Sequence, residues 1–460
     1  MRAWILGILL AIVGVALVLG LWLLGYHLSG RWAFQRWQTQ RIAMGDRFGW
    51  KELAPPPVPP EQNFAEAPLI KGSIIEKGAV DARFNALALP KGADGILGNW
   101  MEGRRDDLDA LSKIYGTADL QTVFKPMEAA FRDLDQATRR SGNRFPIAYE
   151  EGEIPALLGF RAAMRTLRVR AVTNLRAGRT DLALEDLQTG LRLADHLKAE
   201  PHLISALLRV AILNITLQVA WEGLEDHRWT ASQLATLQGD LARIDLLATL
   251  QRAWQAERQF SIGGLMALAE NQPRPASYAQ AKPGEVRLGA LGRGWVYRNL
   301  LESSRYLTML VDVQDPQSHR VHPDRMISGE AWLKPLRYRY DLVLAKIALP
   351  ALVGQVERFA RTQALLDEGV VVCALERHRL DKGQYPERLE ALAPAYLQAL
   401  PHDLVSGEPL RYARKGEGFA LYQVGWDGQD NDGTTAWTGE GRDRKLDPAR
   451  GDWVWPHANR

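Results

Sequence analysis

An uncharged apolar segment near the N-terminus limits what this chain can fold into more than any other feature. Residues 3–26 contain no charged side chain. As a helix rising 1.5 Å per residue, this segment would be about 36 Å long, which exceeds the roughly 30 Å hydrocarbon core of a bilayer. Trp4 and Trp22 lie near its ends, where amphipathic rings favour the membrane interface. We therefore predict a transmembrane anchor at residues 1–26 that crosses the membrane from Trp4 to Leu24.

A cleaved signal peptide is the alternative. Its apolar region would be about 7–15 residues long and would end at a cleavage site of small residues. The segment here is longer, and Gly-Tyr-His-Leu-Ser-Gly at positions 25–30 is a poor cleavage site. These features favour an uncleaved signal-anchor with a single pass through the membrane.

Two signals conflict over the orientation of the anchor. Counting Lys and Arg favours a cytoplasmic C-terminal side, because four arginines follow the span, namely Arg31, Arg36, Arg41 and Arg47. A short basic start before an apolar run is instead typical of exported anchored proteins, and the C-terminal part described below also favours export. We expect a protein of the inner (cytoplasmic) membrane whose soluble part is on the periplasmic side, and the conflict stays open.

Composition excludes several classes of protein. Of the 460 residues, 46% are hydrophobic and 24% are charged, which is a globular composition and excludes a disordered chain, a collagen-like fibre and a polytopic membrane protein. The net charge of +3 is too small to indicate nucleic acid as a partner. The single cysteine, Cys373, excludes an internal disulfide and a cysteine-cluster metal site. Its apolar surroundings at 370–375 predict a buried, inert thiol.

The chain divides into four predicted parts. After the anchor, residues 27–100 form a juxtamembrane segment and linker, in which the prolines at 55–60 predict an extended polyproline II spacer. Residues 101–340 form a helical domain, because apolar residues recur every three or four positions. Its end is loop-rich and basic, with eleven Lys and Arg against seven Asp and Glu over residues 271–345. Residues 341–460 form the last part.

Local signals inside the helical domain predict individual helices. The segment from Leu175 to Ala183 resembles the turn of a tetratricopeptide-like hairpin, with Gly178 at the turn and Thr180 as the expected cap of the next helix. The resemblance covers one hairpin only. Thr230 begins a Thr-Ala-Ser-Gln capping-box pattern. The fold class expected is therefore mainly α, with a helical bundle or short α-solenoid following the transmembrane helix and a small α+β module at the end.

No motif in the sequence identifies a reaction. The chain contains no G-x-S-x-G, H-E-x-x-H, Walker A or G-x-G-x-x-G pattern. Three histidines of the helical domain lack a carboxylate at metal-ligand spacing and are interpreted as solvated or capping residues, namely His196, His202 and His227. We therefore predict no catalytic residue and no organic cofactor.

The C-terminal part carries the most specific pattern. Residues 374–386 read Ala-Leu-Glu-Arg-His-Arg-Leu-Asp-Lys-Gly-Gln-Tyr-Pro, and residues 421–428 read Leu-Tyr-Gln-Val-Gly-Trp-Asp-Gly. In this order they resemble the C-terminal module of the type II secretion major pseudopilins, over about residues 355–455. The resemblance implies a long helix packed on a small antiparallel sheet, and we therefore expect a pseudopilin-like α+β module at 341–460.

The same resemblance implies a calcium site in the closing loop of the module. Carried over residue by residue, the expected side-chain ligands are Asp427, Asp430, Asp432 and Asp452. Carboxylate oxygens are what this hard cation prefers. The Asp-Asn-Asp-Gly run at 430–433 is out of register with an EF-hand loop, which excludes that motif. The alternative is that these residues only form tight turns.

The chain also departs from that family. Pseudopilins begin with a processed leader and carry a Glu inside their membrane helix, and this anchor has neither, so we do not expect a filament subunit.

As a whole the chain resembles uncharacterised membrane-anchored bacterial proteins that append such a module to a helical region, and this resemblance implies no activity. We expect a membrane-anchored envelope protein of binding or assembly type, with an envelope protein partner near a secretion or pilus-like system. The alternatives are a hydrolytic enzyme with an unrecognised site in the helical domain and a degenerate filament component.

Overall fold

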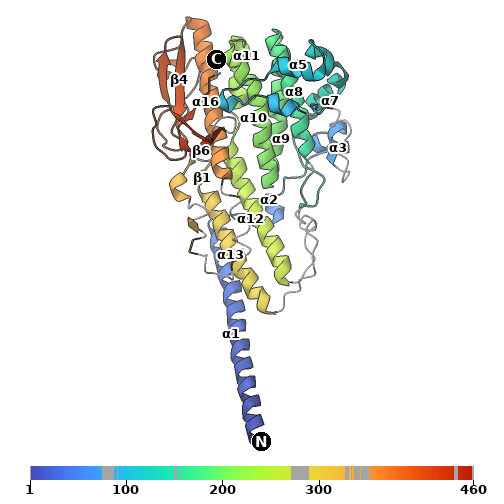
Figure 1. Ribbon diagram of the computed structural model, residues 1–460, viewed down its shortest axis with the longest axis vertical. Coiled ribbons are helices and arrows are strands. Elements are labelled where there is room, and N and C mark those ends of the chain that lie inside the picture. The colour runs from blue at the N-terminus through green and yellow to red at the C-terminus, as the bar shows by residue number, and fades with distance from the viewer. Residues whose placement is uncertain are drawn as a thin grey trace.

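The computed structural model describes residues 2–74, 87–90, 92–149, 153–155, 157–270, 290–326, 354–439 and 444–457, with a few positions between 331 and 352. The protein is mainly helical, begins with an apolar helix, and has small antiparallel sheets in its C-terminal part, as the sequence predicts (Figure 1). The helices of the N-terminal and central parts are α1 (Arg2–Ala43), α2 (Trp50–Leu53), α3 (Pro68–Ile74), α5 (Leu108–Tyr115), α6 (Leu120–Phe124), α7 (Glu128–Thr138), α8 (Leu158–Arg176), α9 (Thr180–His196), α10 (Leu203–Glu225), α11 (Ala231–Leu241), α12 (Leu246–Glu270) and α13 (Ala290–Asp312).

Helix α1 has two unlike halves (Figure 1). From Trp4 to Trp22 every side chain that the structure describes is exposed, with exposed fractions of 79% and 62% for these two tryptophans. The helix is long and apolar enough to cross a membrane, with a mean hydropathy of 2.0 over its most apolar window and none of that window buried. The other described helix that passes the same test is α10, but 72% of its window is buried inside the protein.

The second half of α1 is packed instead of exposed. Phe34 is 2% exposed and lies in a cluster with Ile262 of α12 and with Val296 and Leu300 of α13. Asp46, just after α1, ties these helices together, because it accepts hydrogen bonds from Arg41 Nε (2.9 Å) and from Arg258 Nη1 (2.5 Å). We call this three-helix assembly, formed by residues 26–43 with α12 and α13, the stem.

The expected spacer after the anchor is packed on the protein instead of extending away from it. Trp50 and Leu53 of α2 are buried against α12. The proline run follows the same surface, where Arg140 donates to the carbonyl of Pro60 (3.0 Å) and a Cβ on Gly142 would lie 2.8 Å from a methyl group of Val58. The sequence signal for an extended backbone therefore does not predict a free linker here, since apolar residues on both sides of the prolines dock into the core.

Helices α8, α9 and α10 form the centre of the body, and α10 is buried on nearly all sides because it is apolar all round (Figure 1). The hairpin between α8 and α9 follows the prediction, with Gly178 at a φ of 76° in its turn. The predicted cap at Thr180 is wrong by one residue, because α9 begins at Thr180 and Arg179 occupies the N-cap position without a side-chain bond. The capping box at Thr230 is confirmed.

The C-terminal part pairs one long helix with short strands. Its elements are α16 (Gln355–Lys382), β3 (Arg411–Lys415), β4 (Gly418–Gln423), β5 (Thr435–Thr438), β6 (Lys445–Gly451) and β7 (Trp453–Val454), and a further small ladder joins β1 (Gln314–Asp315) to β2 (Arg320–Val321). Strands β3, β4 and β7 form an antiparallel sheet, with Tyr412 opposite Leu421 and Gln423 opposite Trp453. Helix α16 ends at Gly383, whose φ is 77°. The sequence predicts a long helix that starts near Tyr340 and that a glycine ends; its end is confirmed, and its expected start lies largely outside the described residues.

One hydrophobic core joins the helical body to the C-terminal part. Helix α16 lies between the sheet and the helices α10, α11 and α12 (Figure 1). The largest buried cluster contains Trp221 of α10, Leu241 of α11, Cys373 of α16 and Leu421 of β4. The C-terminal tail also docks on the body, because Trp221 Nε1 donates to the carbonyl of Pro456 (2.9 Å). The predicted boundary between residues 340 and 341 therefore separates two parts that share one core.

Candidate functional site

The four predicted calcium ligands lie in one corner of the C-terminal part, around the loop between β4 and β5. Asp452 is 1% exposed, and its carboxylate accepts the backbone N–H of Asn431 (3.0 Å) and of Gly433 (2.7 Å). Burial raises the pKa of Asp452. Asp427 accepts the N–H of Gly451 (3.2 Å) at the end of β6. These two carboxylates hold the loop against the neighbouring strands.

The other two aspartates face different surroundings. Arg411 Nε donates to Asp430 Oδ2 (2.5 Å) and lowers the pKa of this carboxyl group. Asp430 Oδ1 also accepts the N–H of Asp432 (3.0 Å). Asp432 is exposed at the tip of the turn, with a φ of 55° in the left-handed region. Asp430 is therefore paired with Arg411, and Asp432 is exposed to solvent.

This arrangement does not fit a resident calcium ion. Calcium requires six to eight oxygen ligands at about 2.3–2.6 Å. Both carboxylate oxygens of Asp452 instead accept hydrogen bonds from backbone N–H groups, and the carboxylate of Asp430 is paired with the guanidinium of Arg411. Within the described residues, no group of three or more His, Cys, Asp or Glu side chains could hold a metal ion. The local geometry is that of carboxylates that close tight turns. Calcium binding at these four aspartates stays a prediction.

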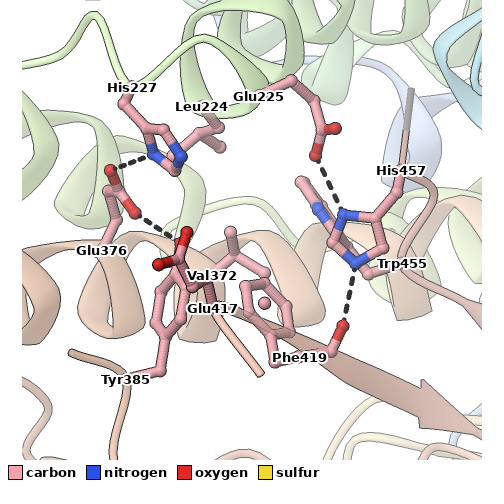
Figure 2. Close-up of a pocket in the computed structure, with 11 residues that line it drawn as sticks. Leu224, Glu225, His227, Val372, Glu376, Tyr385, Glu417, Phe419, Trp455 and His457 are labelled. Atoms are coloured by element: carbon pink, nitrogen blue, oxygen red, sulfur yellow. Dashed lines mark hydrogen bonds and ion pairs between the residues drawn. The ribbon is translucent and has the colours of Figure 1, made fainter. Parts of the chain in front are cut away.

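A cavity of about 320 Å³ lies where the helical body meets the C-terminal part (Figure 2). Its walls come from the end of α10 and the turn after it, from the middle of α16, from the turn between β3 and β4, and from the C-terminal tail. Two histidines from distant parts of the chain stand on its opposite walls, and each is paired with a glutamate (Figure 2).

His227 is the first of these histidines. Its Nδ1–H donates to Glu376 Oε1 (2.7 Å), and Glu376 is 3% exposed. Glu376 also accepts hydrogen bonds from Tyr385 Oη (2.8 Å) and Arg379 Nη2 (2.6 Å). Burial opposes ionisation of Glu376, but Arg379, Tyr385 and His227 together lower its pKa. The carboxylate is therefore an anion that fixes the imidazole ring through Nδ1. In the neutral ring this bond places the proton on Nδ1 and the lone pair on Nε2.

His457 is the second histidine, and both of its ring nitrogens are occupied. Nδ1–H donates to Glu225 Oε1 (3.1 Å) and Nε2–H donates to the carbonyl of Phe419 (3.0 Å). Two acceptors favour the protonated ring, because the neutral imidazole has only one N–H to donate. The bond to Glu225 accordingly raises the pKa of His457. His457 thus fastens the C-terminal tail to α10 and to β4.

The cavity has the means for binding and for proton transfer. A carboxylate that orients an imidazole with a free Nε2 is the arrangement of a general base. Glu417 adds an exposed carboxylate to the same wall. None of the residues that the structure places in the lining is Ser, Thr, Cys or Lys. The site therefore suits a ligand that donates hydrogen bonds, or a water molecule polarised by His227.

A second, open groove of about 580 Å³ lies between α11, α16 and residues 397–402. His319 Nε2–H donates to Asp367 Oδ2 (2.8 Å) there, which raises the pKa of His319. His402 packs edge-on against His319, with ring centres 6.2 Å apart. His319 thus meets a carboxylate from α16, and it does not form a metal cluster with other described residues.

Sequence reasoning missed both histidine–glutamate pairs. His227 and Glu376 are 149 residues apart, and no local pattern connects them. The interpretation of His196 and His202 as solvated residues is wrong, because they are 8% and 5% exposed. His202 does occupy the N-cap position of α10, but without a side-chain cap bond. His196 stacks on Phe64 with ring centres 4.4 Å apart, and its Nε2–H donates to the carbonyl of Thr138 (3.0 Å). An imidazole is apolar enough on its faces to take a core position.

Comparison with known proteins found no match to any family model, any curated protein or any solved structure.

Proposed function

We propose that this chain is a membrane-anchored binding protein whose body is held close to the bilayer by a rigid stem. The observation that carries the proposal is the exposure of α1 from Trp4 to Trp22, which leaves a continuous apolar cylinder without a protein partner among the described residues. About 25 cal/mol per Å² is lost when apolar surface stays in water. An exposed helix of this length is therefore stable in a bilayer and not in solvent.

The stem determines how the anchor presents the body. Helix α1 continues without a break from the exposed half into the half that packs on α13 (Figure 1). The body therefore cannot swing freely on a linker. The C-terminal tail, which forms one wall of the cavity, lies in the part of the molecule far from the N-terminal end of the anchor (Figure 1). This arrangement suits a protein that presents a binding site at a fixed height above a membrane.

The flotation of reconstituted protein tests the anchor. Full-length protein mixed with zwitterionic vesicles is expected to float with them and to resist alkaline extraction. A V13R/L17R variant is expected to lose this behaviour, because both side chains are exposed near the middle of the span and an arginine there costs about 2.5–3.5 kcal/mol. An L182R/I204R variant is the matched control, since these side chains are also exposed and apolar but belong to the body. Equal flotation of both variants would refute the anchor.

For location we propose the inner (cytoplasmic) membrane with the body on the periplasmic side. The support is the resemblance of the C-terminal part to an exported module, whose implied arrangement of a long helix on an antiparallel sheet matches α16 with β3, β4 and β7. Reporters that are active on only one side of the membrane, fused after Arg460, test this orientation. A cytoplasmic signal would reverse it, in agreement with the Lys and Arg count.

The partner proposed is an envelope protein of a secretion or pilus-like system. The support is again the resemblance of residues 355–455, together with a cavity built from that part and the helical body. In-cell crosslinking from a cavity position such as Glu417, which is exposed, is expected to capture one defined envelope protein. Crosslinking from the exposed Lys71 of α3, which lies on the opposite side of the body from α16 and the sheet (Figure 1), serves as the control.

Hydrolysis by an activated water molecule is a second candidate function. The pair of His227 and Glu376 favours it, because the free Nε2 of an oriented imidazole is a general base. Full-length protein screened against ester, amide and phosphoester substrates is expected to show an activity that H227Q lacks. An activity equal in the wild type and H227Q would exclude His227 from the reaction.

A further inference from the structure

Three arginines surround the stem where α1 leaves the proposed membrane. Arg298 lies over the ring of Tyr26, 4.2 Å from its centre, and donates to Ser29 Oγ (3.1 Å). Arg293 precedes Gly294, whose Cα packs against His27 so closely that a Cβ there would lie 2.8 Å from the His27 Cα. Arg31 follows one helical turn after His27. We call Arg31, Arg293 and Arg298 the collar.

The collar lies at the depth of lipid headgroups. If the hydrocarbon core covers α1 from Trp4 to Leu24, the backbone of Arg31 lies about 10 Å beyond it at 1.5 Å per residue. The headgroup layer adds roughly 5–8 Å to each side of the core, and an arginine side chain extends back over apolar surface to reach it. Gly294 contacts α1 at His27, so Arg293 lies closer still to the lipid phosphates.

The charged residues in the two segments that form this surface are all basic. No acidic residue occurs in the sequence before Asp46, and between Glu285 and Glu302 there is none either. In contrast to Arg41 and Arg258, which pair with Asp46, the collar arginines form no ion pair with a carboxylate of the described part of the chain. Arg31 and Arg293 are exposed to solvent. The two exposed guanidinium groups and the half-buried one of Arg298 lack an anion of the described part of the chain that would neutralise them.

We propose that the collar binds the phosphate groups of anionic phospholipids, so that these lipids are enriched around the stem. A guanidinium forms paired hydrogen bonds with phosphate oxygens. The exposed Trp32 adds an amphipathic ring at the same level. This inference rests on the proposed membrane anchor and adds a chemical class of partner to it.

Lipid competition on the full-length protein tests the collar. The protein is placed in discs that contain equal amounts of phosphatidylglycerol and phosphatidylcholine with the same acyl chains, and the retained lipids are counted by native mass spectrometry. The wild type is expected to retain phosphatidylglycerol in several-fold excess, with a smaller excess at high salt. Removal of two of the arginines is expected to bring the excess close to one, because one cation at an anionic surface contributes up to about a fivefold preference.

The R31Q/R293Q variant measures that loss. R228Q/K415Q is the matched control, because it removes two exposed charges from the end of the molecule near the cavity and is expected to keep the full preference. R31K/R293K is expected to keep most of it, and so distinguishes lost charge from lost folding. Equal retention of both lipids by the wild type, or an unchanged preference in R31Q/R293Q, would refute the binding of anionic lipids by the collar.

Three further outcomes separate lipid binding by the collar from the binding of free anions and from a failure of the anchor. If millimolar inorganic phosphate abolishes the preference for phosphatidylglycerol, the collar binds free anions and the assignment to lipid is wrong. If the full-length protein enters neither lipid, the proposed anchor fails. If it enters both lipids without preference, the anchor stands and the collar alone is refuted.

Discussion

At the scale of single residues, buried carboxyl groups give the clearest predictions. Glu357 in the first turn of α16 is 9% exposed, and its Oε1 has no hydrogen-bond partner among the described residues. Burial and the nearby Asp447 raise the pKa of Glu357 to about 7, against the opposing effect of Arg361. The folded protein therefore holds this proton more tightly than the unfolded chain does. Stability decreases as the pH rises from about 4.5 to 7, because ionising the buried group costs free energy.

The substitution E357Q removes that cost. We expect it to raise the free energy of unfolding by about 2–3 kcal/mol above pH 7 and to change it little near pH 4. Urea denaturation of the full-length protein in detergent at both pH values measures the difference. E408Q is the control, since Glu408 is exposed. A gain of the same size at both pH values would show that Glu357 is not protonated in the folded protein.

Asp452 distinguishes a turn from a calcium site. In the structure its carboxylate accepts N–H groups of the loop between β4 and β5. We expect D452A to lower the melting temperature by the same amount with chelator and with added calcium, because those hydrogen bonds do not depend on a metal; one cap of this kind contributes about 1 kcal/mol. D432A, at the exposed tip of the turn, is the control. A loss seen only with calcium present would establish the metal site, since a bound ion stabilises the folded form.

At the scale of elements, the sequence predicts what local chemistry determines. The capping box at Thr230 and the glycine that ends α16 at Gly383 follow from the two or three residues beside them. The hairpin of β3 and β4 follows from alternating side chains around a glycine turn. The docking of α1 on α13 does not follow from any such pattern, because Gly30 and Gly294 meet across more than 260 residues. The pair of His227 and Glu376 is beyond sequence reasoning for the same reason.

The stem depends on close contact between two glycine backbones. A Cβ on Gly294 would lie 2.8 Å from the His27 Cα, and a Cβ on Gly30 would lie 3.1 Å from the Gly294 carbonyl oxygen. We expect G294L to separate α1 from α13, because backbone atoms at these distances cannot move aside as a flexible side chain can. The spin–spin distance between labels on Arg36 and Arg305, both outside the contact, is expected to increase and to broaden.

G239L is the control for that substitution. Gly239 on α11 has no atom within 4 Å of an added Cβ, so its replacement is expected to leave the label distance unchanged. An unchanged distance in G294L as well would mean that the packing of α1 on α13 does not depend on the glycine contact. The body would then be held at its height by the apolar cluster around Phe34 and by the bonds of Asp46.

At the scale of the whole molecule, the parts that the sequence separates behave as one unit. The pattern of charges and motifs divides the chain near residue 340, but the residues on either side of this boundary share a core. Cys373 shows this directly: it is fully buried on α16, in the same cluster as Trp221 of the body and Leu421 of the sheet. A shared core of this kind predicts that the body and the C-terminal part unfold together.

The single cysteine provides a probe of that cooperativity. Burial raises the pKa of Cys373 to about 12, so the folded protein presents neither an accessible sulfur nor a thiolate. We expect a thiol reagent to label Cys373 over the same range of denaturant in which helical circular dichroism is lost, because the sulfur is exposed only when α16 separates from both the sheet and α10. An L182C variant, labelled at an exposed position on α9, is expected to react without denaturant and so fixes the rate for an open site. Labelling of Cys373 well below the unfolding transition would mean that the C-terminal part detaches while the helical body stays folded. The cavity between them would then open and close without unfolding of the protein.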